Sequence, residues 1–417
     1  MFRRRMTLIV GAVVVMVGVA ACGQGGGTST TSSSAAANDF TFIAAEYSSQ
    51  TQGYWQDLIT RFEAKNPGVT VHLQVINWND INQKVNTLVA TNQAPDLLNI
   101  DVFSGYAKDG LLADANSYLP SSTMTQFSKP ILETGQVNGV QVVVPLLADV
   151  RALFYNKAIF AAAHIAQPPT TWAELRADAL KIKALGYIGY GLPLGPEEAH
   201  GEFSLWLFGA GGDWKTNGKW TVNSPQALTA LNEMKNLAVV DKVTEVNPGT
   251  TNRDDLIKVF GEGKVGMMAG GTFLPGIVHS QNPKLEIGVT PIPVQVAGTP
   301  SATINASDYM MAFKSAKNPK LIGQFLAFFY QTDNYVKFLS TEGFVPATTT
   351  AQTAMKKDAL IGPFISSVST AKYYPNTDPA WAAVEAQAMQ QLGTVLQGQA
   401  TPKAVLDALQ QTAIRGK

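Results

Sequence analysis

Acidic and aromatic side chains stand shortly after several segments that read as strands. Asp101 follows residues 96–100, Asp149 comes soon after residues 142–146, and Phe273 follows a third such segment. Carboxylates accept hydrogen bonds from hydroxyl groups, and aromatic rings pack against apolar C–H faces. This combination of residue types suits the reversible binding of a hydroxyl-rich solute.

The same carboxylates leave a catalytic alternative open, because hydrolysis of a glycosidic bond needs two carboxyl groups at a defined separation. The sequence contains no HExxH motif, no nucleophile elbow and no Gly-rich phosphate loop. Its histidines are scattered singly, at His72, His164, His200 and His279. We therefore expect that the chain is not an enzyme and that it binds no metal and no cofactor.

The charge balance excludes nucleic acid as the partner. The 417 residues carry 31 basic and 31 acidic side chains, and Arg3, Arg4 and Arg5 account for three of the bases. A protein that neutralises phosphates needs a basic stripe, and none is visible along the chain. With 46% hydrophobic residues, the chain is long enough to build two domains.

The N-terminus has the form of a secretory signal that ends at a cysteine. The three arginines precede an uncharged apolar stretch, residues 8–21, which is too short to span a bilayer comfortably. Residues 19–23, Val-Ala-Ala-Cys-Gly, resemble the lipobox of bacterial lipoproteins, and Cys22 is the only cysteine in the chain. We expect a signal peptide over 1–21, lipidation of Cys22 and a flexible Gly/Ser/Thr/Ala tether over 22–38. The lipid would anchor the protein at the extracytoplasmic face of the cell membrane, with no other membrane contact.

After the tether, apolar patterning alternates between strand and helix. Strands are predicted at 40–45, 69–75 and 96–100, with helices at 53–65 and 81–91. This βαβαβ order predicts a parallel sheet, whose ligands bind beyond the carboxyl ends of the strands. The loops that end there carry several polar and aromatic residues: Tyr47, Gln50, Trp78, Asn79, Asp80 and Asp101.

A second set of α/β elements follows. Strands are predicted at 141–145, 152–155 and 265–269, and a helix begins at Trp172 behind a capping box of Thr171 and Glu174. The last seventy residues read as largely helical. Two α/β lobes are therefore expected.

An ordered series of segments resembles the extracellular solute-binding proteins of ABC importers, in the sugar-binding group that includes maltose-binding protein. The resemblance runs from about Asp39 to the C-terminus. It is carried by Ala94-Pro95-Asp96-Leu97-Leu98, Gly105-Tyr106-Ala107-Lys108-Asp109-Gly110-Leu111-Leu112, Phe154-Tyr155-Asn156-Lys157, Pro169-Thr170-Thr171-Trp172-Ala173-Glu174-Leu175, Gly211-Gly212-Asp213, Phe260-Gly261-Glu262-Gly263-Lys264-Val265-Gly266-Met267-Met268 and Gly343-Phe344-Val345-Pro346.

The resemblance implies an α/β two-lobe periplasmic-binding-protein-like fold with parallel-rich sheets, a central cleft and hinge crossings. The crossings are expected near 149–153, 291–299 and 343–347. The N-terminal lobe would comprise 39–148 and 300–342, and the C-terminal lobe 149–299 and 343–417.

The resemblance, together with the loop positions, gives a set of candidate ligand-binding residues: Tyr47, Gln50, Asp101, Asp149, Glu198, Gly271, Phe273, Asp308 and Trp381. Structural roles compete with this interpretation. Asp101 could cap the next helix, Asp149 could pair with Arg151, and Trp381 could belong to the core.

The implied function is capture of a small neutral solute, a sugar or oligosaccharide, by a monomer that delivers it to ABC permease subunits. Leu98 and Ile100 stand where the relative has a stacking tryptophan, so a long glucan fits less well than a shorter saccharide. The alternatives are a polyamine, a peptide or a phosphate ester on the same fold, or a lipid-anchored glycoside hydrolase.

Overall fold

The computed structural model describes residues 38–358, 361–365, 367–369 and 371–416. The expected signal peptide and Cys22 therefore lie outside the described residues. Within the described ranges, no helix is both long enough and apolar enough to cross a membrane.

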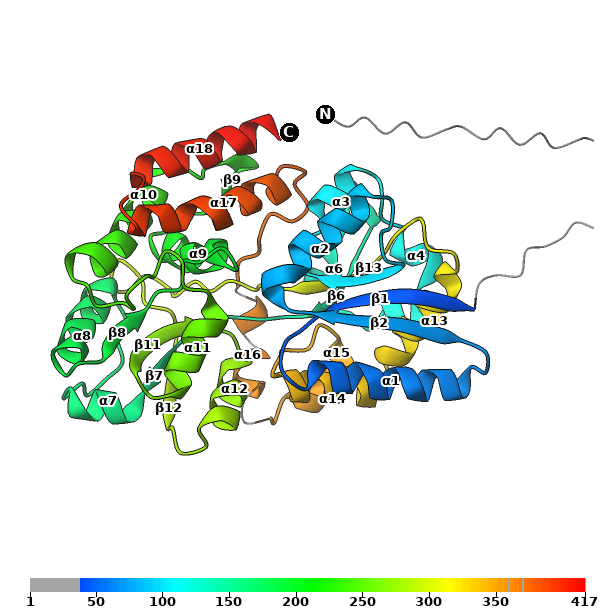
Figure 1. Ribbon diagram of the computed structural model, residues 1–417, viewed down its shortest axis with the longest axis horizontal. Helices are drawn as coiled ribbons and strands as arrows, with labels where there is room; N and C mark the ends of the chain where they lie inside the picture. Colours follow the sequence, from blue (N-terminus) through cyan, green and yellow to red (C-terminus); the bar gives the residue numbers. More distant parts are fainter. Residues whose placement is uncertain (1–37, 359–360, 366, 370, 417) are drawn as a thin grey trace, which may run out of the picture. The chain divides into compact units, whose positions relative to one another are not determined.

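The first lobe is built on a five-stranded sheet in the order β2-β1-β3-β13-β6 (Figure 1). β1 pairs in parallel with both β2 and β3, as the βαβαβ pattern predicts, whereas β13 runs antiparallel to β3 and β6. The strands are β1 (Asp39–Ala45), β2 (Thr70–Ile76), β3 (Leu97–Ile100), β6 (Val144–Leu147) and β13 (Asp308–Ala312).

The second lobe is built on a four-stranded sheet in the order β12-β7-β11-β8. Only β11 and β8 pair in parallel, and β7 runs antiparallel to both of its neighbours. The strands are β7 (Ala152–Asn156), β8 (Ile188–Gly191), β11 (Val265–Gly270) and β12 (Ile287–Thr290).

The expected two-lobe α/β fold is confirmed, but its sheets are mixed rather than parallel-rich. Parallel pairing needs a crossover connection of a dozen or more residues, which the β-α-β order of the first hundred residues supplies. β13 and β7 instead enter their sheets from the opposite lobe, and each runs against its neighbours. Nothing in the local sequence pattern encodes that direction.

Helices cover both faces of each sheet. Figure 1 shows α1 and α14 on one side of the first sheet and α2 and α3 on the other. The helices are α1 (Thr51–Lys65), α2 (Trp78–Ala90), α3 (Ser104–Lys108), α4 (Ala115–Tyr118), α5 (Ser121–Met124), α6 (Lys129–Glu133), α7 (Lys157–Ala162), α8 (Trp172–Ala184), α9 (Ala199–Gly209), α10 (Pro225–Lys235), α11 (Arg253–Gly261), α12 (Leu274–Gln281), α13 (Pro319–Phe329), α14 (Thr332–Glu342), α15 (Thr349–Met355), α16 (Gly362–Ile365), α17 (Trp381–Leu396) and α18 (Pro402–Arg415). The smaller elements are β4 (Gln136–Val137), β5 (Val140–Gln141), β9 (Lys215–Thr216), β10 (Lys219–Trp220), a π-helix (Asn236–Val240) and a 3₁₀-helix (Ser367–Ser369).

The capping box predicted at the start of α8 is confirmed. The Thr171 hydroxyl accepts from the Glu174 amide at 3.2 Å, and the Glu174 carboxylate accepts from the Thr171 amide at 3.1 Å. Two of the amides left without a helical partner are thereby satisfied, which fixes where the helix begins.

An aromatic core holds the first sheet in place. Phe42 on β1 meets the fully buried Trp55 of α1 edge-on, with ring centres 4.9 Å apart. Burying a side chain such as Phe42 contributes roughly 1.5–3 kcal/mol. This packing fixes β1 against α1. It thereby also fixes the start of the loop that carries Tyr47, which follows β1 directly.

Three chain segments cross side by side between the two sheets. Ala148 and Val345 exchange two backbone hydrogen bonds of 2.9 and 3.0 Å, and the Ala306 amide donates to the Asp149 carbonyl at 2.9 Å. The middle crossing lies later than expected, because Val294 still pairs with Thr171 in the second lobe. The chain passes back at residues 303–307, immediately before β13.

Candidate functional site: a pocket between the two lobes

A cavity of about 60 Å³ lies between the lobes, next to the crossing segments. Its walls come from the ends of β1, β3 and β6 on one side and from residues of α9, α11 and the loop after β11 on the other. Six of the nine predicted site residues line it: Tyr47, Asp101, Asp149, Glu198, Phe273 and Asp308.

The other three predicted residues do not reach the cavity wall. Gln50 is exposed at the start of α1. Trp381 is fully buried, and its ring stacks on that of Tyr374 with centres 5.2 Å apart. Gly271 lies behind the wall, where an added Cβ would come within 2.4 Å of Asp149 Oδ1 and 2.3 Å of Phe273 Cε1.

On the first-lobe side, Tyr47 and Asp308 form a short polar pair. The Tyr47 hydroxyl donates to Asp308 Oδ2 at 2.5 Å and lies 3.1 Å from Asn99 Oδ1. Burial raises the pKa of Asp308 well above its usual value, and the nearby Asp101 carboxyl raises it further. A carboxyl that keeps its proton can both donate to and accept from a hydroxyl group of a solute.

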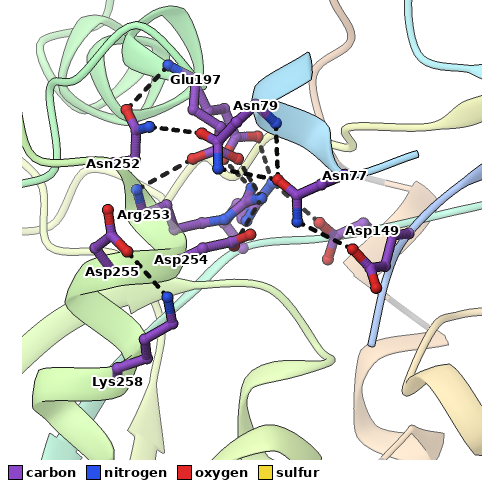
Figure 2. A network of polar contacts seen from close by, with 12 residues as sticks. Asn77, Asn79, Asp149, Glu197, Asn252, Arg253, Asp254, Asp255 and Lys258 are labelled. Atoms are coloured by element: carbon purple, nitrogen blue, oxygen red, sulfur yellow. Dashed lines mark hydrogen bonds and ion pairs between the residues drawn. The ribbon is translucent and has the colours of Figure 1, made fainter. Parts of the chain in front are cut away.

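On the second-lobe side, acidic and basic side chains alternate. Asp149 lies 3.1 Å from Arg151, and Arg151 lies 2.5 Å from Glu198. Arg253 contacts Glu198 and also lies 2.5 Å from Glu197 (Figure 2). The ion pair between Asp149 and Arg151 is thus formed, and the Asp149 carboxyl also lines the cavity.

Burial and the two arginines have opposite effects on the ionisation of the carboxyl groups in the cavity wall. Burial alone would raise the pKa of Glu198, but Arg151 and Arg253 hold it below its usual value. For Asp149 burial prevails over Arg151, and its pKa rises to about 6. Burial and the nearby Glu385 raise the pKa of Asp101 to about 7.

Phe273 presents an aromatic ring to the same wall. The guanidinium carbons of Arg151 and Arg253 lie 5.5 and 5.3 Å from its ring centre, within the range of cation–π attraction. The Phe344 ring packs against it, with centres 5.5 Å apart. The ring is therefore held in a fixed orientation, as a stacking contact with any ligand requires.

Several hydrogen bonds join the two lobes around the cavity. The Asn252 amide donates to Asn79 Oδ1 at 2.6 Å (Figure 2), and the Asn376 amide donates to the Asp101 carbonyl at 3.3 Å. Cavities that enclose drug-sized ligands measure about 300–1,000 Å³. A ligand of that size can therefore enter only if the lobes move apart.

Sequence reasoning missed Arg253 and Glu197 as wall residues. Glu197 precedes α9 and Arg253 begins α11, and neither position belongs to a sequence motif. Trp78, named only as a mouth residue, does line the cavity. The only sequence signal for these two residues was that charged side chains stand at the starts of two helices. Charged residues are equally common at helix starts that face solvent, so this signal did not point to a site.

Two sequence relatives of known name cover most of this chain. A binding protein of Brucella abortus (strain 2308) is 30% identical over 383 residues, which cover 89% of this chain and 91% of that protein. The diacetylchitobiose binding protein DasA of Streptomyces coelicolor is 27% identical, with 79% of this chain and 78% of that protein covered.

Solved structures share the fold. Maltose-bound MalE3 of T. maritima superposes with a TM-score of 0.80 at 21% identity, covering 90% of this chain and 99% of that one. A solute-binding protein of Thermotoga lettingae bound with α-D-tagatose gives 0.78 at 21% identity, with the same coverage. Residues 48–336 match the sequence model of a single family. By that match, this chain belongs to the bacterial extracellular solute-binding proteins.

Proposed function

We propose that this protein captures a saccharide between its two lobes and delivers it to the permease of a bacterial ABC importer. The open form binds the solute, the lobes close by bending at the three crossings, and the closed form meets the membrane subunits. The observation that carries the proposal is the cavity itself, on which Asp101, Asp149 and Asp308 converge together with the ring of Phe273.

The charges in the cavity favour a neutral solute. Arg151 and Arg253 are both paired with carboxylates, so they offer little net positive charge to a phosphate ester. The same pairing occupies Glu197 and Glu198, two carboxylates that a polyamine would need. Diacetylchitobiose, maltose and tagatose, named for the relatives above, are neutral and rich in hydroxyl groups or amides.

The role needs no covalent chemistry. Closure removes water from the solute and brings the carboxyl groups and the aromatic ring into contact with it at the same time. The free energy of these contacts is enough to hold the solute, and no covalent bond has to form. Hydrolysis by two of these carboxyl groups is the opposing hypothesis, and it predicts release of a reducing end from an oligosaccharide. Retention of intact oligosaccharide over prolonged incubation would support capture alone.

We further propose that a lipid on Cys22 anchors the protein, as a monomer, at the extracytoplasmic face of the cell membrane. The lipobox-like residues that end at Cys22 and the uncharged tether support this location. Cys22→Ser is expected to move the protein from the membrane fraction to the soluble fraction and to abolish incorporation of labelled palmitate. A variant that stays in the membrane fraction would contradict the anchor.

The test of function is a thermal-shift screen of the purified protein against sugars, polyols, amino acids, polyamines and peptides. A solute at about 100 times its Kd stabilises the folded state by about 2.7 kcal/mol, which gives a clear rise in Tm. A saccharide that raises Tm would support the proposal. A polyamine or a peptide that does so would replace the saccharide, and no response across the panel would contradict solute capture.

The site is tested by calorimetry on variants with the solute that responds. Asp101→Ala and Asp149→Ala each remove a charge-assisted hydrogen bond and should weaken binding by about 1–3 kcal/mol. Unchanged affinity in both variants would overturn the site and leave the fold untouched.

A further inference from the structure

Three side chains that could ligate a metal ion meet beside the solute cavity. Asp101 follows β3 in the first lobe, His200 is the second residue of α9, and Glu385 lies on α17. One ligand atom from each lies within 4.8 Å of the other two. His200 and Glu385 are only 2% and 4% exposed, so they are shielded from water.

The polar atoms of this cluster are incompletely satisfied. His200 Nε2 lies 3.1 Å from Glu385 Oε1 without forming a regular hydrogen bond, and neither Nε2 nor Nδ1 has a hydrogen-bond partner among the described residues. Asp101 Oδ1 is buried and also lacks a partner within the described part of the chain. Buried polar atoms of native proteins nearly always have a partner, and a metal ion placed between these side chains would supply one to each of them.

We propose that Asp101, His200 and Glu385 bind a divalent transition-metal ion, most naturally zinc. An imidazole nitrogen with two carboxylates is a donor set that zinc accepts, whereas magnesium and calcium prefer oxygen ligands alone. The two carboxylates also supply the negative charge that balances a divalent cation. Zinc bonds to nitrogen and oxygen measure about 2.0–2.2 Å, so binding draws the three side chains slightly together.

Such an ion would link solute binding to closure. Asp101 belongs to the first lobe, and α9 and α17 belong to the second, so one ion bridges both lobes. Three protein ligands leave a coordination position open. Because Asp101 and His200 both line the solute cavity, that position faces the solute.

The competing interpretation is a simple ion pair between His200 and Glu385, which needs no metal. The two interpretations differ in a direct measurement: only the first gives stoichiometric metal binding by the chain. This measurement is independent of which solute, if any, the protein transports.

The experiment uses the purified protein, stripped with a chelator and then titrated with zinc chloride by calorimetry. Metal content is measured after gel filtration, and cobalt(II) serves as a second probe through its visible absorption. We expect one zinc ion per chain. His200→Ala and Glu385→Gln should each lower the zinc affinity by on the order of 100-fold or more.

The matched control is His72→Ala. His72 lies 3.4 Å from Asp39 on the surface, with about half of each side chain exposed, and forms the other histidine–carboxylate pair among the described residues. This variant should keep the stoichiometry and the affinity of the wild type. Zinc binding that is lost in His72→Ala but kept in His200→Ala would overturn the proposal.

Failure to retain zinc in the wild type, or equal affinity in the wild type and both buried variants, would also overturn it. Melting of the metal-free variants shows whether they fold. If His200→Ala and Glu385→Gln unfold the chain, the zinc affinity of Asp101→Asn becomes the test, because Asp101 is only partly buried and its substitution should leave the fold intact. An affinity of Asp101→Asn equal to that of the wild type would then refute the site.

Discussion

The side-chain amide of Asn252 donates a 2.6 Å hydrogen bond to Oδ1 of Asn79 and thereby ties the second lobe to the first beside the cavity (Figure 2). Asn252 is the residue before α11, and Asn79 lies in the first turn of α2. The bond exists only while the lobes are together, so it stabilises the closed form and leaves the open form unchanged. Both side chains are at the surface, and a hydrogen bond of this kind contributes about 0.5–1.5 kcal/mol.

Asn79→Ala should therefore weaken solute binding by up to about tenfold, since 1.4 kcal/mol corresponds to a factor of ten. Calorimetry measures the affinity, and small-angle scattering reports whether the variant is more open. The control is Asn223→Ala, which removes a 2.9 Å bond to Asp407 within the second lobe. An equal loss of affinity in both variants would show that the bond between the lobes has no special role.

Gly271→Ala should disturb the cavity wall because the added methyl group collides with two wall residues. Its Cβ would lie 2.4 Å from Asp149 Oδ1 and 2.3 Å from Phe273 Cε1. We expect loss of solute affinity and destabilisation of about 1–3 kcal/mol. In Gly276→Ala, by contrast, the new Cβ meets nothing within 4 Å, and a Gly to Ala change inside a helix stabilises by up to about 1 kcal/mol. Similar melting temperatures for the two variants would contradict the close packing at Gly271.

Phe273→Ala should weaken binding by removing the platform on which a sugar face stacks. Loss of the apolar contact predicts a decrease of about 1–3 kcal/mol in binding free energy. Phe273→Trp keeps an aromatic face and should retain most of the affinity, although the larger ring has to fit beside Arg253 and Phe344. A calorimetric series in which the Ala and Trp variants bind equally well would exclude stacking on this ring.

Glu202 should make stability depend on pH. It accepts hydrogen bonds from Tyr190 (2.8 Å) and Trp206 (3.1 Å), and burial raises its pKa from 4.5 to about 7. The unfolded chain releases this proton near pH 4.5, so the contribution is complete below that pH and is lost as pH rises through about 7. The loss is on the order of 3 kcal/mol, at about 1.36 kcal/mol per pKa unit.

Urea denaturation at about pH 5 and about pH 8 measures this difference. Glu202→Gln cannot ionise and should reduce the difference, whereas Glu286→Gln, an exposed control, should leave it as in the wild type. Burial also raises the pKa values of Asp101 and Glu245 to about 7, so these groups lower the stability in the same direction as the pH rises. Glu202→Gln should therefore still lose some stability between about pH 5 and about pH 8, but less than the wild type. An identical pH dependence in the wild type and Glu202→Gln would contradict the buried, protonated state.

The sequence predicted the parts of the site that stand at the ends of strands. Asp101 comes directly after β3, Asp149 comes shortly after β6, and Asp308 begins β13, so their places at the sheet edge could be argued from the α/β pattern and the family resemblance together. Trp381 was harder to place, because the spacing of a helical tryptophan is the same for a core residue and a ligand contact. Its burial against Tyr374 depends on packing that no local pattern encodes.

The other residues of the site could not be predicted because they lie far apart along the chain. Arg253 lies 56 residues after Glu197 and 55 after Glu198, and the folded second lobe brings the three side chains together. His200 and Glu385 looked like unrelated residues in the sequence, and only the packing of α17 against α9 brings them together. Contacts of this kind carry no periodicity, so hydrophobic patterning cannot reveal them.

The position of β13 in the first sheet has a kinetic consequence. β13 lies between β3 and β6, with Tyr309 paired to Ile100, so the sheet stays split until residues 149–307 have been synthesised. Strand pairings between residues so far apart in the sequence form slowly. Closing the long intervening loop costs conformational entropy, and this cost comes before the pairing contributes any stabilisation. The first sheet is therefore expected to form later during synthesis than a sheet built from one continuous segment, which would keep the chain unfolded for export if the expected signal peptide is present.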